Sequence, residues 1–191
     1  NLALGVTTRH DPSSRSALVF PALEMVRAGK IIGPRSFSTG EIVYGAKNPH
    51  VYAQIDSKAD ALAHIRRLKA QGAHSIKNYN QPRRDQRQQV VAAAIEENMR
   101  SVAEGGSLFG LDMTLIADGN TTVEHNVPVE TFYQDVQQFF SRSKVGYTPT
   151  LVVTYGGPAA DPYWRSHTEV WKQPLLQKHV PESVLVAGSA R

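Results

Sequence analysis

The chain has 191 residues, a formal net charge of +4 and a pI near 9.4, which suits one domain with a substantial core. It contains no cysteine, which excludes disulfide bonds and thiolate metal ligands, so a metal site would have to use histidine, carboxylate or a modified lysine. No apolar run approaches the roughly 20 residues that span a bilayer, and aromatic residues are not interleaved with the basic ones. We therefore expect neither a membrane nor a nucleic-acid partner.

Short apolar segments alternate with amphipathic segments along the first third of the chain. Ser57 is a suitable N-cap for one of the helices, and Gly29 and Gly72 are typical helix stops. The expected elements, in chain order, are a strand at Leu4–Arg9, a helix at Ser16–Ala28, a strand at Ile31–Ser38, a long loop at Glu41–Ile55 and a helix at Lys58–Gln71.

The same alternation continues through the rest of the chain. A complete eight-unit β/α barrel usually needs roughly 250 residues, so the length favours a partial barrel or a smaller α/β sheet. We predict an α/β fold, a partial (β/α) TIM-type barrel of about six strand-helix units, as one domain over residues 1–191. The expected elements are strands at Ala73–Tyr79, Ser101–Glu104, Thr121–His125 and Tyr147–Thr154, and helices at Arg84–Met99, Leu108–Ala117, Pro128–Ser141 and Tyr163–Gln173.

Lys77 lies near the carboxyl end of a strand that we expect to be buried. Burying an ammonium group is costly unless it is paired or chemically changed. A carboxylated lysine that bridges two metal ions is one solution, and an ion pair with a carboxylate of a neighbouring strand is the other. The residues alone favour the ion pair.

His125 ends another predicted strand, directly before an Asn-Val-Pro turn. A neutral imidazole is the commonest metal ligand, so His125 is a candidate ligand, although a hydrogen-bonded loop histidine explains it equally well. Glu104, Asp118 and Glu124 supply carboxylates nearby in the sequence, and His10, after the first strand, is a further candidate for the same site. Because Glu124 and His125 are adjacent, at most one of them should face inward from a strand.

Several segments resemble the amidohydrolase superfamily, in particular its imidazolonepropionase-like branch and the amidohydrolase domain of proteins that also carry a TolB-like β-propeller. The similarity runs in order along nearly the whole chain. The segments that carry it are Gly5–Ser14, Gly33–Gly40, Ser75–Tyr79, Ala103–Gly106 and Val123–His125, and the most specific stretches are Asn78–Gln89 and Tyr147–Val153.

The resemblance implies that the chain holds the second to the seventh strand of such a barrel and lacks the first and last strands with their ligands. Lys77 falls at the fourth-strand ligand position and His125 at the sixth, which reverses the preference for a plain ion pair at Lys77. The fifth-strand histidine would fall near Val102, so Glu104 becomes the substitute ligand. The implied cofactor is a divalent metal, zinc above all, and the incomplete ligand set leaves open that none is bound here.

The function implied by the resemblance is that of a fragment of a metal-dependent amidohydrolase. Such an enzyme hydrolyses C–N bonds of amides or cyclic amides in a small-molecule substrate through a metal-activated water, and we expect this chain to be inactive alone. The alternative is a non-catalytic partial barrel that serves as an assembly or binding module. Outer strands without neighbours leave unpaired edges, so we also expect a homodimer.

Overall fold

The computed structural model of the chain describes residues 1–47, 53–106, 108–150 and 169–189. Its contacts divide it into two compact units, Thr8–Pro149 and a second made of Asn1–Thr7 and Thr150–Arg191. The prediction of one domain over the whole chain stays a prediction. The larger unit contains the strands β1 (Thr8–Asp11), β2 (Arg35–Ser38), β3 (Ile42–Val43), β4 (Ser75–Asn78), β5 (Arg100–Glu104), β6 (Thr122–Glu124) and β7 (Gly146–Thr148), and the helices α1 (Ser16–Arg27), α2 (Lys58–Ala70), α3 (Arg84–Glu96), α4 (Phe109–Ala117) and α5 (Gln134–Ser143).

The strands of the larger unit form two parallel sheets. One pairs β1 with β2, and the other runs in the order β3-β4-β5-β6-β7, so each strand of this sheet lies beside its neighbour in the sequence. The two sheets are in contact, because His74 N donates a hydrogen bond of 3.2 Å to Ser38 O at the end of β2. Parallel neighbours require crossover connections, and the helices provide them.

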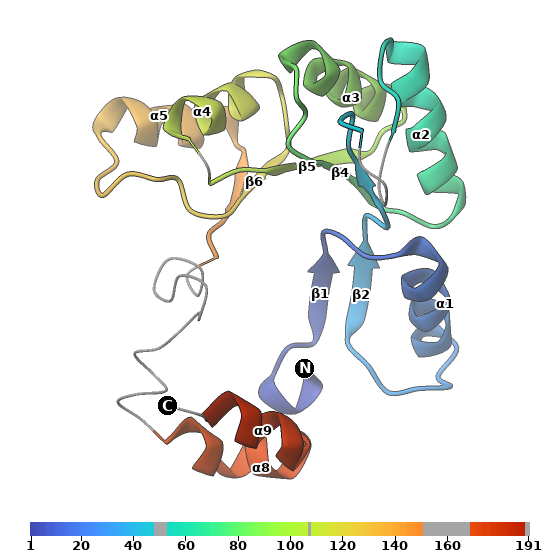
Figure 1. Cartoon of the computed structure of the whole chain (residues 1–191), viewed down its shortest axis with the longest axis vertical. Coiled ribbons are helices and arrows are strands. Elements are labelled where there is room, and N and C mark those ends of the chain that lie inside the picture. Colours follow the sequence, from blue (N-terminus) through green and yellow to red (C-terminus); the bar gives the residue numbers. More distant parts are fainter. Residues whose placement is uncertain (48–52, 107, 151–168, 190–191) are drawn as a thin grey trace. The chain divides into compact units, whose positions relative to one another are not determined.

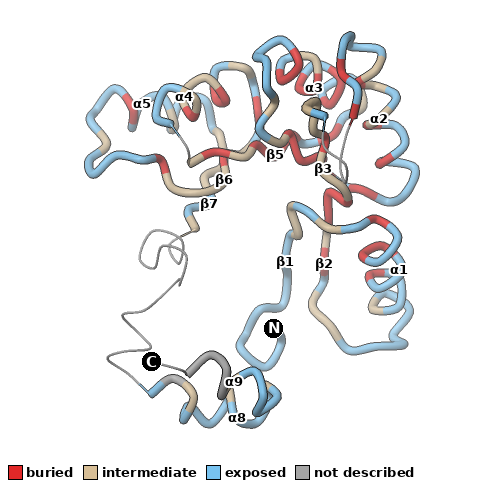
Figure 2. The backbone as a smooth tube through the Cα atoms, viewed as in Figure 1, coloured by how far each residue is buried: buried red, intermediate tan, exposed pale blue. Residues whose placement is uncertain are grey.

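The four helices α2 to α5 lie on one face of the five-stranded sheet (Figure 1). Figure 2 shows many buried residues where these helices meet the sheet. Most of the buried residues are apolar, and a polar group of Asn78, Ser101 and Asn120 is buried with them. On β4 and β5 this face carries Ile76 and Ala103, both 0% exposed. Because side chains alternate along a strand, the residues next to these two, Lys77 and Glu104, leave the sheet on the opposite face.

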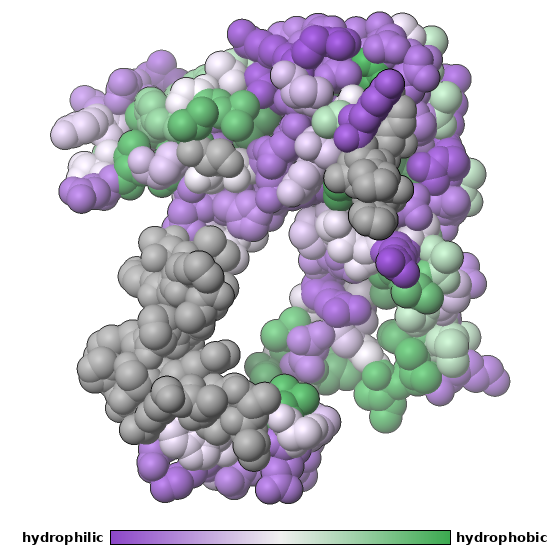
Figure 3. Space-filling model, in the orientation of Figure 1, coloured by the Kyte–Doolittle hydropathy of each residue, from purple (hydrophilic) through white to green (hydrophobic). Residues whose placement is uncertain are grey.

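Local sequence signals explain the helix α2 well. Ser57 and Asp60 form a capping box at its start, and its inward face is buried at a helical spacing through Ala61, Ile65 and Leu68. The predicted helix at Lys58–Gln71 is therefore confirmed to within one residue. The outer surface of α2 and α3 is largely hydrophilic (Figure 3) and carries ion pairs between the two helices, such as Lys58–Glu96 at 2.6 Å.

The predicted partial TIM-type barrel of six strand-helix units is wrong. The strands form separate sheets of two and five strands, and β3 lies within the segment that was expected to be a loop at Glu41–Ile55. The reason is local: Gly40 has a φ of +65°, a left-handed conformation that glycine adopts without cost, and the chain turns there between β2 and β3. The first strand also begins at Thr8 and not at Leu4.

The last predicted elements are described only in part. The strand expected at Tyr147–Thr154 is seen as β7, and its residues 151–154 lie outside the described residues, as do residues 163–168 of the helix expected at Tyr163–Gln173. The smaller unit contains η1 (Leu2–Leu4), η3 (Val170–Lys172), α8 (Pro174–His179) and α9 (Glu182–Ser189). Within the described part of the chain, no helix is both long enough and apolar enough to span a membrane.

Candidate active site

Three side chains from neighbouring strands meet near the carboxyl ends of β4, β5 and β6. Lys77 Nζ lies 2.6 Å from Glu104 Oε2, and His125 Nε2 lies 2.9 Å from Glu104 Oε1. Lys77 comes from β4, Glu104 ends β5 and His125 directly follows β6. Because parallel strands end at the same edge of a sheet, residues 21 to 48 positions apart in the sequence converge here on one carboxylate.

The exposure of these three side chains rises from the lysine to the histidine. The Lys77 side chain is 3% exposed, that of Glu104 17% and that of His125 35%. The buried ammonium is thus matched by a carboxylate on the next strand, which is the ion pair that the residues alone favoured. Glu104 and His125 stay open to solvent in part.

Glu124 and His125 behave differently from two ordinary strand neighbours. Glu124 is in register with Glu104, so its side chain leaves the sheet on the same face. His125 lies beyond the end of β6 with a φ of +70°, a left-handed conformation that is uncommon outside glycine. Strand alternation no longer applies at that position, and the imidazole can also reach Glu104.

The predicted metal ligands Lys77, Glu104 and His125 are brought together, but the arrangement does not fit a metal ion as it stands. An ammonium group has no lone pair to give to a cation, and it occupies one oxygen of Glu104. Among the residues that the structure describes, no group of three or more His, Cys, Asp or Glu side chains could hold a metal. The metal role of these three residues stays a prediction.

Asp112 is a neighbour of this cluster that the sequence analysis missed. It lies in α4, is 0% exposed and accepts a hydrogen bond of 2.9 Å from Gly106 N. Burial raises the pKa of the Asp112 carboxyl, while the Gly106 N–H and the charge of His125 oppose this rise. A single charged residue within the apolar run of Phe109–Ala117 was the signal in the sequence that could have revealed it.

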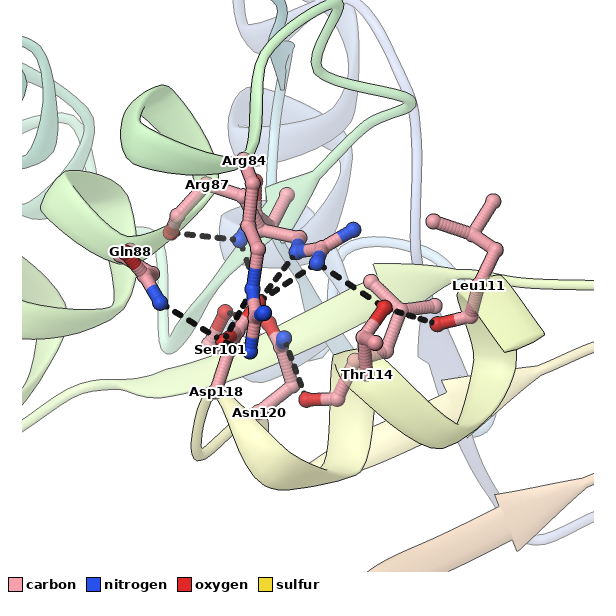
Figure 4. Close-up of polar contacts among 10 residues, drawn as sticks. Arg84, Arg87, Gln88, Ser101, Leu111, Thr114, Asp118 and Asn120 are labelled. Carbon is pink, nitrogen blue, oxygen red and sulfur yellow. Dashed lines mark hydrogen bonds and ion pairs between the residues drawn. The ribbon is translucent and has the colours of Figure 1, made fainter.

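His10 and Asp118 are two further candidates. His10 Nε2 lies 2.7 Å from Ser75 Oγ, a contact that joins β1 to the start of β4. Burial lowers the pKa of His10, and the charges of Glu124 and Lys77 also act on it, so His10 lies near the cluster. Asp118 follows α4, and it accepts hydrogen bonds from Arg84 and Arg87 on α3 and from Gln88 (Figure 4). The Asp118 carboxylate therefore links α3 to the end of α4 on the helix side of the sheet. It does not contact the cluster around Glu104 on the other face.

Comparisons with known proteins reveal a shared fold. No protein-family model and no curated protein sequence matches the chain. Similar solved structures are an Xaa-Pro dipeptidase with methionine bound in its active site (20% identity over 78% of this chain and 44% of that one, TM-score 0.58), a protein assigned as a prolidase from Bifidobacterium longum (19%, 77% and 39%, TM-score 0.61) and the bottromycin amidohydrolase AH (17%, 100% and 46%, TM-score 0.58). This chain spans less than half the length of each.

These findings overturn the predicted family assignment to the imidazolonepropionase-like, propeller-linked branch of the amidohydrolase superfamily. The proteins with this fold are named as a dipeptidase, a prolidase and a bottromycin amidohydrolase. The segments that suggested the other assignment include short strand ends and turns, such as Ala103–Gly106 and Val123–His125. Parallel α/β proteins of many kinds place similar residue types at such positions, because the same chain geometry recurs there.

Proposed function

We propose that this chain belongs to a hydrolase that cleaves amide bonds, with Lys77, Glu104 and His125 at the reacting centre. The observation that carries the proposal is the convergence of Lys77 and His125 on Glu104 at the carboxyl edge of the parallel sheet, the usual place for the active site of an α/β protein. The shared fold supports it, because the dipeptidase and the bottromycin amidohydrolase are named for the cleavage of amide bonds.

The three side chains suit the proton transfers of amide hydrolysis. Cleavage requires a base that takes a proton from the attacking water and an acid that gives one to the leaving amine. Glu104 is a partly exposed carboxylate whose negative charge is balanced from the buried side by Lys77. His125 Nε2 touches the same carboxylate and is the most exposed of the three, so it can pass a proton between Glu104 and a bound substrate.

A divalent metal, with zinc as the first candidate, is the proposed cofactor. Glu104 and His125 carry the carboxylate oxygen and imidazole nitrogen that zinc prefers. Lys77 could join them only if its ammonium group loses a proton and the amine nitrogen then forms a bond to the carbon of CO2 and releases a second proton, which gives a carbamate with oxygen donors and a negative charge.

Turnover of amide substrates tests the proposal. The purified chain would be assayed with Xaa-Pro dipeptides and other small amides, with EDTA or with zinc and bicarbonate. Because the donor set is incomplete in the described residues, we expect slow turnover, in place of the inactivity that the family resemblance implied. Glu104→Gln should reduce it by about 10²-fold or more, whereas Glu41→Gln, which changes an exposed carboxylate paired with Arg67, should not. No turnover under any condition, or equal turnover by Glu104→Gln, would contradict the proposal.

We also propose that the chain self-associates. In the described part of the chain, β1, β2, β3 and β7 each pair with one neighbouring strand only, which leaves one edge of each without a strand partner. A second copy of the chain would cover such edges. Light scattering at micromolar concentration should give the mass of a dimer, and a monomer of 21.0 kDa would rule it out.

A further inference from the structure

Asp112 has a feature that its place in a helix does not explain. The residue is fully buried, and its Oδ1 accepts the hydrogen bond from Gly106 N. Its Oδ2 is also buried and has no hydrogen-bond partner among the described residues. A buried carboxylate oxygen without a partner is costly, and native proteins hold few of them. The hydrogen bond from Gly106 N accounts for Oδ1, whereas nothing among the described residues accounts for the burial of Oδ2.

The turn formed by Gly105 and Gly106 separates Asp112 from His125. A Cβ atom at Gly105 would lie 2.8 Å from Asp112 Oδ1 and 2.8 Å from Glu124 O, and one at Gly106 would lie 2.8 Å from His125 Cβ. Gly106 also has a φ of +88°, which disfavours other residues. Only two glycines let α4 and the segment after β6 approach the turn this closely.

His125 is held from two sides at the point where its backbone is unusual. Its N–H donates a hydrogen bond of 3.0 Å to Thr148 O on β7, and its Cβ rests against Gly106. The turn also begins directly after Glu104, so the carboxylate and the imidazole that meet at 2.9 Å are both attached to it. An electrostatic interaction with His125 across the turn lowers the pKa of the Asp112 carboxyl against the rise that burial causes.

We propose that Asp112 and the Gly105–Gly106 turn position the His125 imidazole against Glu104. Asp112 fixes the turn through Gly106 N and favours one orientation of the imidazole by its charge, and the turn fixes the backbone of His125. Both are positioning elements and touch no substrate. The inference rests on the proposed function only in treating Glu104 and His125 as site residues, since the positioning itself can be measured without any activity.

The glycine turn can be tested with a matched pair of variants. Gly106→Ala and Gly119→Ala both place alanine at a strained backbone, with φ values of +88° and +90°. At Gly119 the new Cβ would meet only Val91 Cγ1, at 3.4 Å, and no atom of His125. The readout is the imidazole ¹⁵N spectrum of ¹⁵N-labelled protein in EDTA, in which His125→Gln identifies the signals. Both variants should lose stability, but only Gly106→Ala should shift the His125 signals.

The role of the Asp112 charge is tested with Asp112→Asn. This variant keeps an acceptor for Gly106 N and removes the negative charge. Its control is Asp85→Asn, at an exposed carboxylate of α3 that pairs with Arg83. We expect the His125 ring signals, and the balance of its two tautomers, to change in Asp112→Asn alone. If either folded variant, Gly106→Ala or Asp112→Asn, gives wild-type His125 signals, its part of the proposal is overturned. If the His125 signals shift as expected but the chain hydrolyses no amide substrate, the positioning role is supported and the proposed function is refuted.

Discussion

Two groups of charged side chains lie on opposite faces of the five-stranded sheet, and they are built in different ways. On the helix side, Asp118 has a side chain that is 1% exposed, and it accepts hydrogen bonds from two arginines and a glutamine. On the other face, Glu104 is 17% exposed and is shared by one lysine and one histidine. Both are single carboxylates between two basic side chains, but only Glu104 stays open to solvent.

The difference separates a structural role from a functional one. A carboxylate that is closed off and surrounded by donors can bind nothing else, so its contacts serve the packing of α3 against α4. A carboxylate that is matched on its buried side and open on the other can exchange protons with a substrate. We therefore expect mutations around Asp118 to lower stability most and mutations around Glu104 to affect function most.

The largest expected effect on stability follows from Asp118→Asn. The variant leaves the Arg87 guanidinium, with a side chain 7% exposed, without its carboxylate partner. Breaking a buried ion pair from one side costs about 3 kcal/mol in the free energy of unfolding. Urea denaturation measures this loss. The control Asp85→Asn, at an exposed ion pair, should not change the denaturation midpoint. A midpoint for Asp118→Asn equal to that of the wild type would show that Asp118 has no structural role.

A smaller loss is expected from Glu104→Gln, because water can reach part of the site. The variant leaves the buried Lys77 without its carboxylate, and we expect a loss of about 2 kcal/mol. Adding Lys77→Met should restore much of it, since an apolar side chain can replace a buried ion pair without loss. The double-mutant cycle should give a coupling energy of about 1 to 2 kcal/mol. Additive losses would mean that the two side chains do not interact.

The pH dependence of stability gives a third and weaker test of the Asp118 cluster. Burial alone would raise the pKa of Asp118, but hydrogen bonds from Arg84, Gln88 and Arg87 hold it below its ordinary value of 3.8. A depressed pKa stabilises the fold above the unfolded-state pKa, and this contribution disappears as the pH falls through the lower folded-state pKa. The gap in stability between wild type and Asp118→Asn should thus be constant near neutral pH and shrink below pH 3.8.

The elements that could be predicted from the sequence are those specified by local signals. The helix α2 is one, since Ser57, the spacing of its apolar residues and Gly72 lie within one short segment. The buried strand β4 is a second such element, and the sequence also indicated that burial of the Lys77 ammonium group in it is unfavourable. The pattern even indicated that a carboxylate from a neighbouring strand would meet Lys77, because burial of an unpaired ammonium is unfavourable whatever the fold.

The features that could not be predicted depend on contacts between distant segments. The division of the strands into two sheets depends on which strands pair, and the short β3 has only two residues to signal it. The choice of Glu104 as the partner of Lys77 follows from the register of β4 and β5. The sequence marks Asp112 as a lone charge in an apolar run, but its contact with the Gly105–Gly106 turn is visible only in the structure. His125 reaches Glu104 through a backbone conformation that strand alternation does not anticipate.

The smallest expected change in stability concerns the backbone at His125. It tests whether this site residue contributes to the stability of the fold. His125 and Lys144, an exposed residue at the end of α5, both have positive φ values, +70° and +56°. Lys144→Gly should stabilise the chain by about 0.5 to 1 kcal/mol, because glycine relieves the strain. His125→Gly relieves the same strain but loses the contact with Glu104, worth about 1 kcal/mol. Its denaturation midpoint should therefore stay close to that of the wild type, while its activity is lost. A large loss of stability in His125→Gly alone would mean that His125 serves the fold, as Asp118 does.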